Sequence, residues 1–328
     1  MFKNKLLIKQ IFLNRRLTKK QDRVGSQIET TKLYSKLLLL MFKIFVLVFF
    51  GIVVLFPFYY MISTSLFSNE QAEATNDIHL VPRDINTGKI QLYWENFNKA
   101  FQNGYFRALI FTAAVTALSV CGKTFFSMTF GYAFSLKKWR FKEAAWFFFL
   151  SLLVLPELAL LSQQYIIVSR LGWAGSENNF YILISLTIPF VASVFSGFMF
   201  RNAFEGISDS VKESAKIDGA SELKFFVKIA VPMIKPTIWT VAILTAFASW
   251  NSYIWPSTIF AGSTEAPVLS VWLFNTGKDE TLGTEARFFV NIRMAGAILV
   301  IMPLLVVYVV IRKRIMAAIS RQGTATKG

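Results

Sequence analysis

The sequence is poor in the residues that build catalytic and metal sites. It holds one cysteine, Cys121, and one histidine, His79, in 328 residues. A single cysteine excludes a disulfide framework within the chain and a cysteine-ligated metal site, and a lone histidine cannot form a ligand cluster. We therefore expect no metal site and no catalytic residues, and the chain is not predicted to be an enzyme.

Charged residues are also scarce, at 16% of the chain against 54% hydrophobic residues. This composition is typical of a membrane protein. The charge that is present is unbalanced, since 35 Lys and Arg against 19 Asp and Glu give a formal net charge of +16. A basic balance of this size can indicate nucleic-acid binding. However, the basic residues lie between apolar runs and at both ends, a placement that the positive-inside rule explains without a nucleic-acid partner.

Long apolar runs, in contrast, are abundant. A helix that crosses a bilayer needs about 20 mostly apolar residues. Basic connecting segments alternate with neutral or acidic ones, which places both termini and the loop before the fifth run on the cytoplasmic side. We predict an all-α polytopic membrane protein of about six transmembrane helices. The predicted spans are 44–66, 107–135, 144–168, 180–200, 237–260 and 292–312.

These runs divide the chain into three parts. A basic tail, 1–36, precedes a transmembrane domain, 37–316, and a short cytoplasmic tail, 317–328, follows it. The first tail fits either a solvated cytoplasmic segment or a basic amphipathic helix on anionic lipid. The sequence leaves both interpretations open.

One long polar stretch lies between two apolar runs: residues 209–236, DSVKESAKIDGASELKFFVKIAVPMIKP. Asp209 or Ser210 is predicted to cap a first helix, and Gly219 is predicted to end it at a turn. A second amphipathic helix follows and ends near Pro232, because proline cannot continue a helix interior. The stretch therefore predicts two short helices with a break between them.

Two kinds of side chain in this stretch suit contact with another protein. Glu213 and Asp218 offer carboxylates to basic groups of a partner. Small side chains allow the close approach of a partner surface. An ordinary amphipathic surface helix is the alternative interpretation. The small residues are Ser214, Ala215, Gly219 and Ala220.

The stretch resembles the cytoplasmic EAA loop of the membrane subunits of ATP-binding-cassette (ABC) importers. The family pattern runs Glu-Ala-Ala, then Asp-Gly-Ala, then an apolar tail with prolines. Here, Ser214 replaces an alanine of the pattern, and Ser208 replaces the proline usual before the helix. The resemblance implies the type I ABC importer permease fold. It also implies ATPase coupling by Glu213, Ser214, Ala215, Asp218, Gly219, Ala220 and Pro232.

Two further stretches resemble the same family. Residues 249–256, SWNSYIWP, are similar to the Trp-Asn…Pro signature of its fifth span, and the ending RQGTATKG is similar to the tail of its sugar permeases. Together with the loop, they resemble the second membrane subunit of maltose or glycerol-3-phosphate importers. The resemblance covers the chain from about residue 38 to its end.

This resemblance implies a transport subunit of the bacterial cell membrane. The chain would form half of the translocation pathway for a sugar or glycerol-phosphate-type solute and would bind no cofactor itself. Its implied partners are ATPase subunits that use ATP-Mg, a second homologous permease, an extracytoplasmic solute-binding protein and the lipid bilayer. No nucleic-acid partner is expected.

Lys123 in the second span needs an explanation, because a charge at membrane depth is costly. Glu157 in the third span lies at a similar depth, with both residues about 21 Å from the cytoplasmic edge at about 1.5 Å rise per residue. We predict that the two side chains meet or face a shared aqueous cavity; the alternative is that one faces a partner subunit. The Gly122-Lys123-Thr124 run is not a phosphate-binding loop, since Ala117 occupies the first glycine position within an apolar span.

Other polar residues in the spans are candidates for the substrate pathway. Asn251 offers an amide, and Tyr253 and Trp255 offer aromatic faces that suit stacking on sugar rings. An asparagine in a span can equally bond one helix to another. Gln163 and Gln164 complete this group with Glu157 and Lys123.

Two other classes of membrane protein are alternatives. A secondary transporter not driven by ATP would need inverted repeats, and the sequence shows no second copy of either half. A membrane enzyme would need a cluster of nucleophile, base or metal ligands within the spans. Co-purification with an ATPase separates an importer subunit from both.

Overall fold

The computed structural model describes residues 33–74, 79–102, 104–136, 139–176, 178–260, 268–278 and 288–325. The chain forms two compact units, residues 1–60 and 61–328. The described part is helical. Its only extended pairings are two isolated bridges, Arg83 with Ile90 and Lys278 with Phe288.

The first unit consists, in its described part, of most of helix α2 (Leu33–Ser65). Its side chains are apolar around the whole circumference and exposed, with Leu47, for example, 73% exposed. A helix that is hydrophobic on every side is stable in lipid or buried in protein. Residues Tyr34–Ser65 are long and apolar enough to cross a membrane.

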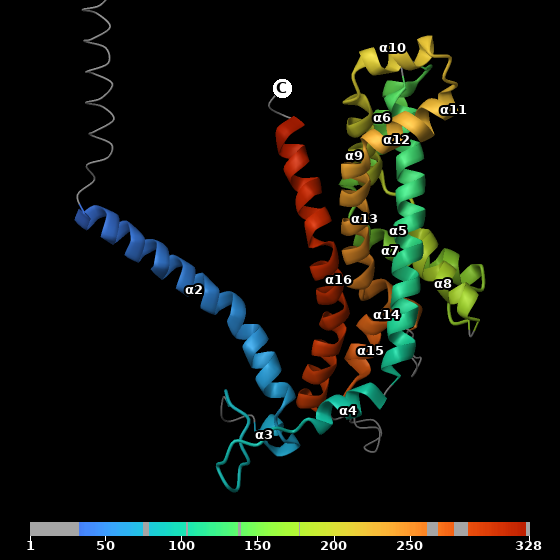
Figure 1. Ribbon diagram of the computed structural model, residues 1–328. Helices are drawn as coiled ribbons and strands as arrows, with labels where there is room; N and C mark the ends of the chain where they lie inside the picture. The colour runs from blue at the N-terminus through green and yellow to red at the C-terminus, as the bar shows by residue number, and fades with distance from the viewer. Residues whose placement is uncertain are drawn as a thin grey trace, which may run out of the picture. The chain divides into compact units, whose positions relative to one another are not determined.

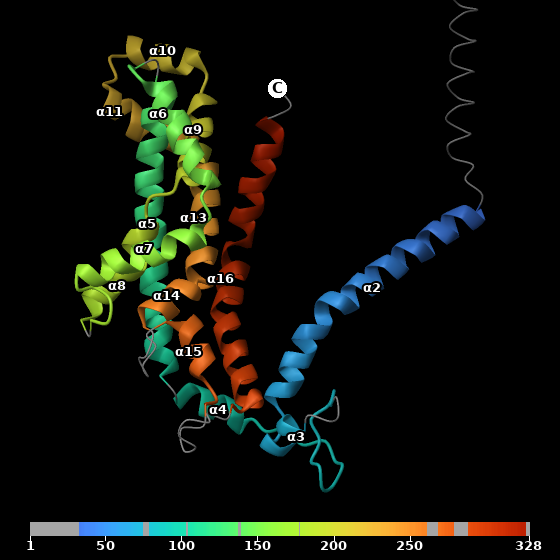
Figure 2. The ribbon, with the colours of Figure 1, turned by 180° about the vertical axis from the view of Figure 1, so that it is seen from behind.

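The second unit is built around four helices that run side by side (Figures 1 and 2). Helix α5 is the centre of this bundle, because it packs on both α9 and α13, and α16 packs on α13. The bundle helices are α5 (Tyr105–Ser135), α9 (Val194–Glu205), α13 (Lys235–Trp250) and α16 (Val290–Ala325).

Three apolar segments are bent helix pairs, and two of them include the bundle helices α9 and α13. Helices α6 (Lys142–Ser151) and η1 (Leu152–Val154) meet α7 (Glu157–Arg170) at 101°. Prolines explain such breaks, because proline lacks the N–H that an α-helix needs and clashes with the preceding turn; here Pro156 precedes α7. The second pair, α8 (Asn179–Thr187) with η2 (Ile188–Phe190) against α9, bends by 59°, and the third, Glu222–Met233 against Lys235–Trp250, by 72°.

Only some of the predicted spans are therefore single helices. Among the described residues, Tyr34–Ser65, Tyr105–Ser135 and Val290–Val310 can each cross a membrane alone, and the number rises to six if each bent pair counts as one span. The segments 144–168, 180–200 and 237–260 are not continuous helices: the first two bend in the middle, and the third is interrupted between Trp250 and Ile254. Six spans remain a prediction.

Short elements close the end of the bundle opposite α10. Asn96, on α4, donates two hydrogen bonds of 2.9 Å to the carbonyl oxygens of Ser65 and Phe67. Asn291, at the start of α16, donates to the Phe67 carbonyl at 3.1 Å and to Asn69 at 2.9 Å. These buried amides tie the end of α2 to α4 and α16. The elements are α3 (Asn69–Glu73), α4 (Glu95–Gln102), α14 (Ile254–Ile259) and α15 (Leu269–Asn275).

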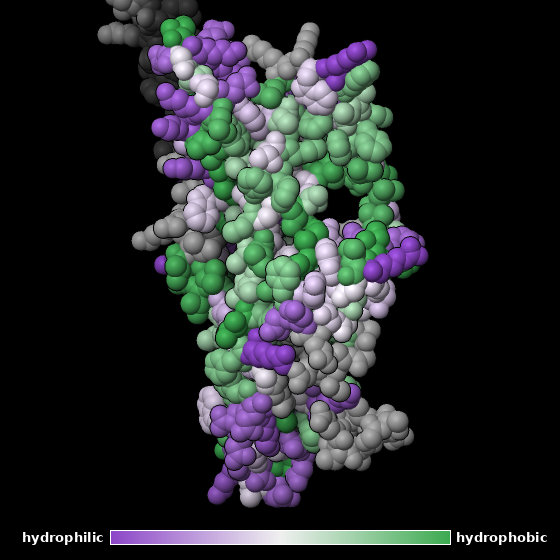
Figure 3. All heavy atoms as spheres, turned by 90° about the vertical axis from the view of Figure 1, so that its right-hand side faces the viewer, coloured by the Kyte–Doolittle hydropathy of each residue, from purple (hydrophilic) through white to green (hydrophobic). Residues whose placement is uncertain are grey.

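The hydrophobic surface of the bundle fits a bilayer. On the face shown in Figure 3, hydrophobic side chains cover the middle, and hydrophilic ones gather mainly at the two ends. An apolar band between polar ends is what a lipid environment selects. The charge-rich stretch 209–236 begins with α10 (Asp209–Ile217), which lies at one end of the bundle (Figure 1).

Candidate functional site

The charge-rich stretch folds as two short helices joined at a glycine. We name residues 209–234 the elbow. Helix α10 (Asp209–Ile217) is followed by α11 (Glu222–Phe225), the π-helix η3 (Phe226–Ala230) and α12 (Val231–Met233). The residue that caps α10 is Ser208, and its side chain makes no capping bond. The predicted caps Asp209 and Ser210 are wrong by one or two positions, since both lie inside the helix.

Gly219 makes the turn between the two helices. Its φ of +67° lies in the left-handed region that glycine adopts without steric cost. The N–H of Gly219 donates to the Lys216 carbonyl at 3.1 Å, and the N–H of Ala220 donates to the Ala215 carbonyl at 2.9 Å. This pair of bonds is the Schellman motif, which ends a helix at a fixed angle. The predicted turn at Gly219 is confirmed, whereas the C-cap residue itself is Asp218.

The inner side of the elbow is packed on the bundle. Ala215 is buried, and Ala230 and Ile234 belong to one buried cluster with residues of α9 and α13. The ring of Phe226 lies 4.5 Å from that of Tyr132 on α5. The elbow is therefore held by side chains of three bundle helices. The buried cluster comprises Phe200, Phe204, Ile207, Ala230, Ile234 and Val241.

The outer side of the elbow is exposed and mixes apolar with acidic groups. Ile217 is 85% exposed and Leu223 73% exposed. Glu213 and Asp218 are exposed as well. Ile217 is one of the most exposed apolar residues of the described part of the chain. Large apolar side chains exposed beside charges are typical of a protein-binding surface.

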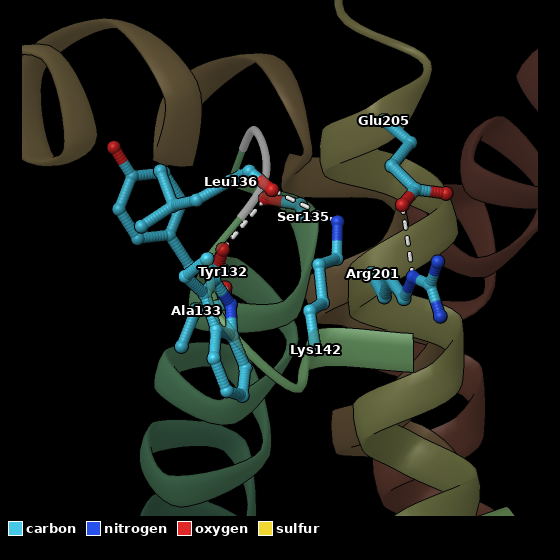
Figure 4. A network of polar contacts seen from close by, with 8 residues as sticks. Tyr132, Ala133, Ser135, Leu136, Lys142, Arg201 and Glu205 are labelled. Carbon is cyan, nitrogen blue, oxygen red and sulfur yellow. Dashed lines mark hydrogen bonds and ion pairs between the residues drawn. The ribbon is translucent and has the colours of Figure 1, made fainter. Parts of the chain in front are cut away.

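Polar contacts fix the end of α5 beside the elbow (Figure 4). Lys142 Nζ donates to the Leu136 carbonyl at 2.8 Å, and Trp139 Nε1 donates to the Ala133 carbonyl at 3.3 Å. On α9, Arg201 Nε donates to Glu205 Oε1 at 2.8 Å. Carbonyls at a helix C-terminus have no partner within the helix. Lys142 and Trp139 satisfy two of these carbonyls and so stabilise the end of α5.

Helices α5 and α9 cross at glycines. A Cβ atom at Gly131 would lie 2.6 Å from Phe200 Cβ and 2.8 Å from the Gly197 carbonyl oxygen, and one at Gly197 would lie 2.4 Å from the Phe130 ring. Membrane helices use small residues in this way to bring backbones together. The crossing lies next to the elbow, because Phe200 also belongs to the buried cluster under it.

Three of the predicted pathway residues make contacts within the chain. Trp255 is buried and donates Nε1 to the Ser185 carbonyl at 2.9 Å. Tyr253 stacks on Phe274 with 4.2 Å between ring centroids. Asn251 Nδ2 donates to the Phe247 carbonyl at 2.9 Å. The Trp255 contact joins two helices, whereas the Asn251 bond stays within its own helix, so the role of Asn251 stays a prediction.

The glutamines and the acidic residue of the third span lie on α7. Gln163 is exposed, and Gln164 Oε1 is buried with no hydrogen-bond partner among the described residues. The side chain of Glu157 lies outside the described part of the structure. Its pairing with Lys123 therefore stays a prediction.

Lys123 lines a partly open cavity of about 130 Å³ at the level of the Trp-Asn stretch. Of the predicted pathway residues whose side chains the structure describes, Lys123 alone lines this cavity. The other polar residues of its wall were not singled out from the sequence, because a single Ser or Thr in a span is ordinary. The polar residues of the wall are Thr112, Ser119, Lys123, Thr245, Ser249, Ser252 and Ser270.

The fold and the elbow define a class: a helical membrane protein with a charged two-helix projection at one end of its bundle. Comparison with known proteins identifies the family. The model of the binding-protein-dependent transport system inner membrane components matches residues 123–321. The chain belongs to this family. It is a permease subunit of an ABC transporter, a transport subunit and not an enzyme, as the sequence predicted.

Individual relatives agree with this assignment. The probable ABC transporter permease protein MG189 homolog of Mycoplasma pneumoniae is 42% identical, with 100% of both chains covered. The sn-glycerol-3-phosphate transport system permease protein UgpE of Escherichia coli O157:H7 is 26% identical over 80% of this chain and 89% of that protein. A solved bacterial ABC transporter involved in the import of the acidic polysaccharide alginate has a TM-score of 0.65 at 23% identity, covering 85% and 97% of the two chains. This last likeness shows the type I importer permease fold.

Proposed function

We propose that the elbow couples this permease to a separate ATPase subunit. The observation that supports this role is the contrast between its two sides: Ala215 is 5% exposed, whereas Ile217 is 85% exposed. The inner side is fixed to the bundle, and the outer side offers apolar groups and carboxylates. A partner that covers Ile217 and Leu223 gains apolar burial, and basic groups on it can pair with Glu213 and Asp218.

The packing under the elbow carries its movement into the bundle. Phe226 contacts Tyr132 of α5 at 4.5 Å and Phe204 of α9 at 5.9 Å between ring centroids. Val241 of α13 belongs to the same cluster. Packed side chains transmit displacement because a close-packed interior has low compressibility. A shift of the elbow when the ATPase closes therefore moves three helices together and opens the pathway to the other side.

The remaining assignments follow the family. ATPase subunits use ATP-Mg in the cytoplasm, where both termini and the tails 1–36 and 317–328 lie. A second homologous permease completes the pathway, and an extracytoplasmic binding protein delivers the solute. We place the chain in the bacterial cell membrane with six spans. The name of the UgpE relative supports a solute of the sugar or glycerol-phosphate type.

Replacement of Gly219 by Leu tests the coupling role. Nothing lies within 4 Å of a Cβ at this position, so the added side chain meets no clash. However, a residue with a side chain pays about 1–2 kcal/mol of conformational free energy at a φ of +67°. The strain opens the angle between α10 and α11. We expect ATPase activity stimulated by the binding protein to fall about tenfold or more, and uptake with it, in proteoliposomes that hold the complete transporter.

A second glycine gives the matched control. Gly175 has φ of +69° and equally open surroundings in the turn before α8. Gly175→Leu carries the same strain outside the elbow and should leave stimulated ATPase activity near the wild-type level. Wild-type uptake by the Gly219→Leu transporter would contradict the coupling role.

A further inference from the structure

We propose that the turn between α5 and α6 binds an anionic phospholipid of the cytoplasmic leaflet. We name its residues 139–142, Trp-Arg-Phe-Lys, the corner. The inference rests on the proposed function, because that function places the end of the bundle with the elbow on the cytoplasmic side. The ligand class is a phospholipid whose headgroup carries a net negative charge, and phosphatidylglycerol is the probe.

The corner lies at the depth of lipid headgroups. Helix α5 has 31 residues and is therefore about 46 Å long at a rise of about 1.5 Å per residue. A bilayer is about 40–45 Å thick with its headgroups and about 30 Å thick without them. When α5 crosses the bilayer as one span, its end at Ser135 and the turn that follows lie among the headgroups.

Aromatic side chains of the corner and of α6 are exposed. Phe141 is 69% exposed and Trp139 41% exposed. In the second turn of α6, Phe147 and Phe148 are 75% and 60% exposed. Tryptophan is typical of the boundary between membrane and water, and phenylalanine rings enter the region of the acyl chains. These rings form the apolar part of the lipid site.

Phe141 is also held in a conformation that costs free energy. Its φ of +65° makes it the one residue other than glycine with a positive φ in the described part of the chain. Side chains are disfavoured at this φ because they crowd the backbone. Burial within the chain does not offset this cost, since most of the ring is exposed. Transfer of the ring from water into lipid supplies the missing stabilisation.

Basic groups accompany the rings. The guanidinium of Arg140 is exposed and lies over the Phe141 ring, and no described residue accepts a hydrogen bond from it. Lys142 uses one of its three N–H donors on the Leu136 carbonyl at 2.8 Å. The sequence of the turn, 136–143, holds four basic residues and one acidic residue. A guanidinium can bind a phosphate through two N–H groups, and the excess of positive charge favours an anionic headgroup over a zwitterionic one.

The corner is connected to the elbow. Trp139 lines a pocket of about 350 Å³ whose wall also includes Glu213 and Lys216 of α10 and Phe225 of α11. The bond from Trp139 Nε1 to the Ala133 carbonyl, at 3.3 Å, fixes the indole to the end of α5. A lipid at the corner therefore stabilises a wall against which the elbow moves. We expect the lipid to raise the ATPase activity that the binding protein stimulates.

The test is native mass spectrometry of the complete transporter in detergent, titrated with phosphatidylglycerol or with phosphatidylcholine of the same acyl chains. The measured quantities are the number of lipids bound and the concentration at which each is half occupied. Arg140→Gln should weaken one phosphatidylglycerol per copy of this chain about 10- to 100-fold, the range of one charge-assisted hydrogen bond, and phosphatidylcholine by less. Arg140→Lys should recover most of the loss. Arg83→Gln is the matched control, because Arg83 is exposed on the segment between α3 and α4, away from the corner.

Two substitutions of Phe141 separate lipid binding from folding. Phe141→Gly removes both the ring and the backbone strain. It should keep or raise the midpoint of thermal unfolding in lipid-free detergent, and it should weaken the same phosphatidylglycerol about tenfold. Phe141→Leu keeps an apolar side chain and should bind that lipid within about threefold of wild type. If Phe141→Gly lowers the midpoint and leaves the lipid affinity unchanged, the ring serves packing and the site is overturned.

The remaining outcomes separate the lipid site from the coupling role. Inorganic phosphate at constant ionic strength should not displace the lipid, because it has no acyl chains; displacement would assign the corner to a free anion instead. Stimulated ATPase activity is measured in phosphatidylcholine nanodiscs with and without phosphatidylglycerol. If stimulation is normal and Arg140→Gln changes neither lipid occupancy nor lipid dependence, the lipid site is overturned and the coupling role stands. If the lipid binds as expected but the binding protein stimulates no ATPase activity, the site is supported and the coupling role of the elbow is not.

Discussion

The elbow and the cavity are two polar regions of one bundle, but they are built in opposite ways. The elbow is a contiguous stretch in which a glycine turn and a Schellman motif set the geometry locally. The cavity is assembled from four segments, with Thr112 and Ser270 far apart in the chain. A region whose geometry is set by local turns can be predicted from the order of its residues in the sequence. A region built by tertiary packing cannot, because each of its residues is ordinary by itself.

The elbow packs over the crossing of α5 with α9, and α5 also forms one wall of the cavity, so breaking this crossing should have the largest effect. A side chain at Gly131 meets the backbone and Cβ of α9 below 3 Å, so neither helix can yield without separating. We expect Gly131→Leu to destabilise the bundle by about 3 kcal/mol and to disturb elbow and cavity together. The yield of monodisperse protein and the midpoint of thermal unfolding in detergent measure this loss.

Gly51 supplies the control for that substitution. It lies on α2 with nothing within 4 Å of a Cβ. Gly51→Leu should therefore keep the wild-type yield and midpoint. A Gly131→Leu protein that is as stable as wild type would mean that the α5–α9 crossing is wider than the structure shows.

A substitution of smaller expected effect tests the outer side of the elbow apart from its packed inner side. Ile217 is exposed, so Ile217→Asp should leave the unfolding midpoint unchanged. Burial of an isoleucine is worth about 1.5–3 kcal/mol, so its loss should weaken the affinity for the ATPase about tenfold or more. Pull-down of the ATPase at graded concentrations measures this affinity.

Ile85→Asp is the matched change on the segment between α3 and α4, where Ile85 is 53% exposed. It should bind the ATPase as wild type does. An Ile217→Asp protein within twofold of the wild-type affinity would place the docking surface elsewhere on the chain.

The sequence predicted the fold class, the family and the break at Gly219, because all three depend on local patterns: apolar run length, motif order and a residue that tolerates positive φ. It missed the bend in the fourth segment and the break between α13 and α14 in the fifth. Hydropathy measures apolar length and not direction, so a run that bends looks continuous. The exposure of Ile217 also could not be predicted, since helical periodicity shows which positions share a face and does not show which face a neighbour covers.

The aromatic residues of the Trp-Asn stretch show the same limit at the scale of single side chains. The sequence offers Trp250 and Trp255 five residues apart, and it suggested Trp255 for the solute pathway. In the structure, Trp255 is buried with Nε1 bonded to the Ser185 carbonyl, whereas Trp250 lines the cavity. The ring that serves packing and the ring that faces the cavity are distinguished only by tertiary contacts.

The smallest expected effect separates these two rings. Trp255→Phe removes one buried hydrogen bond and should lower the free energy of unfolding by about 1 kcal/mol beyond the loss of volume that both substitutions share. Trp250→Phe should show no such additional loss, because the Trp250 N–H has no acceptor among the described residues to lose. Thermal unfolding of the two variants measures the difference. Equal losses in both variants would mean that the two rings serve packing alike, and that facing the cavity does not distinguish Trp250 from Trp255.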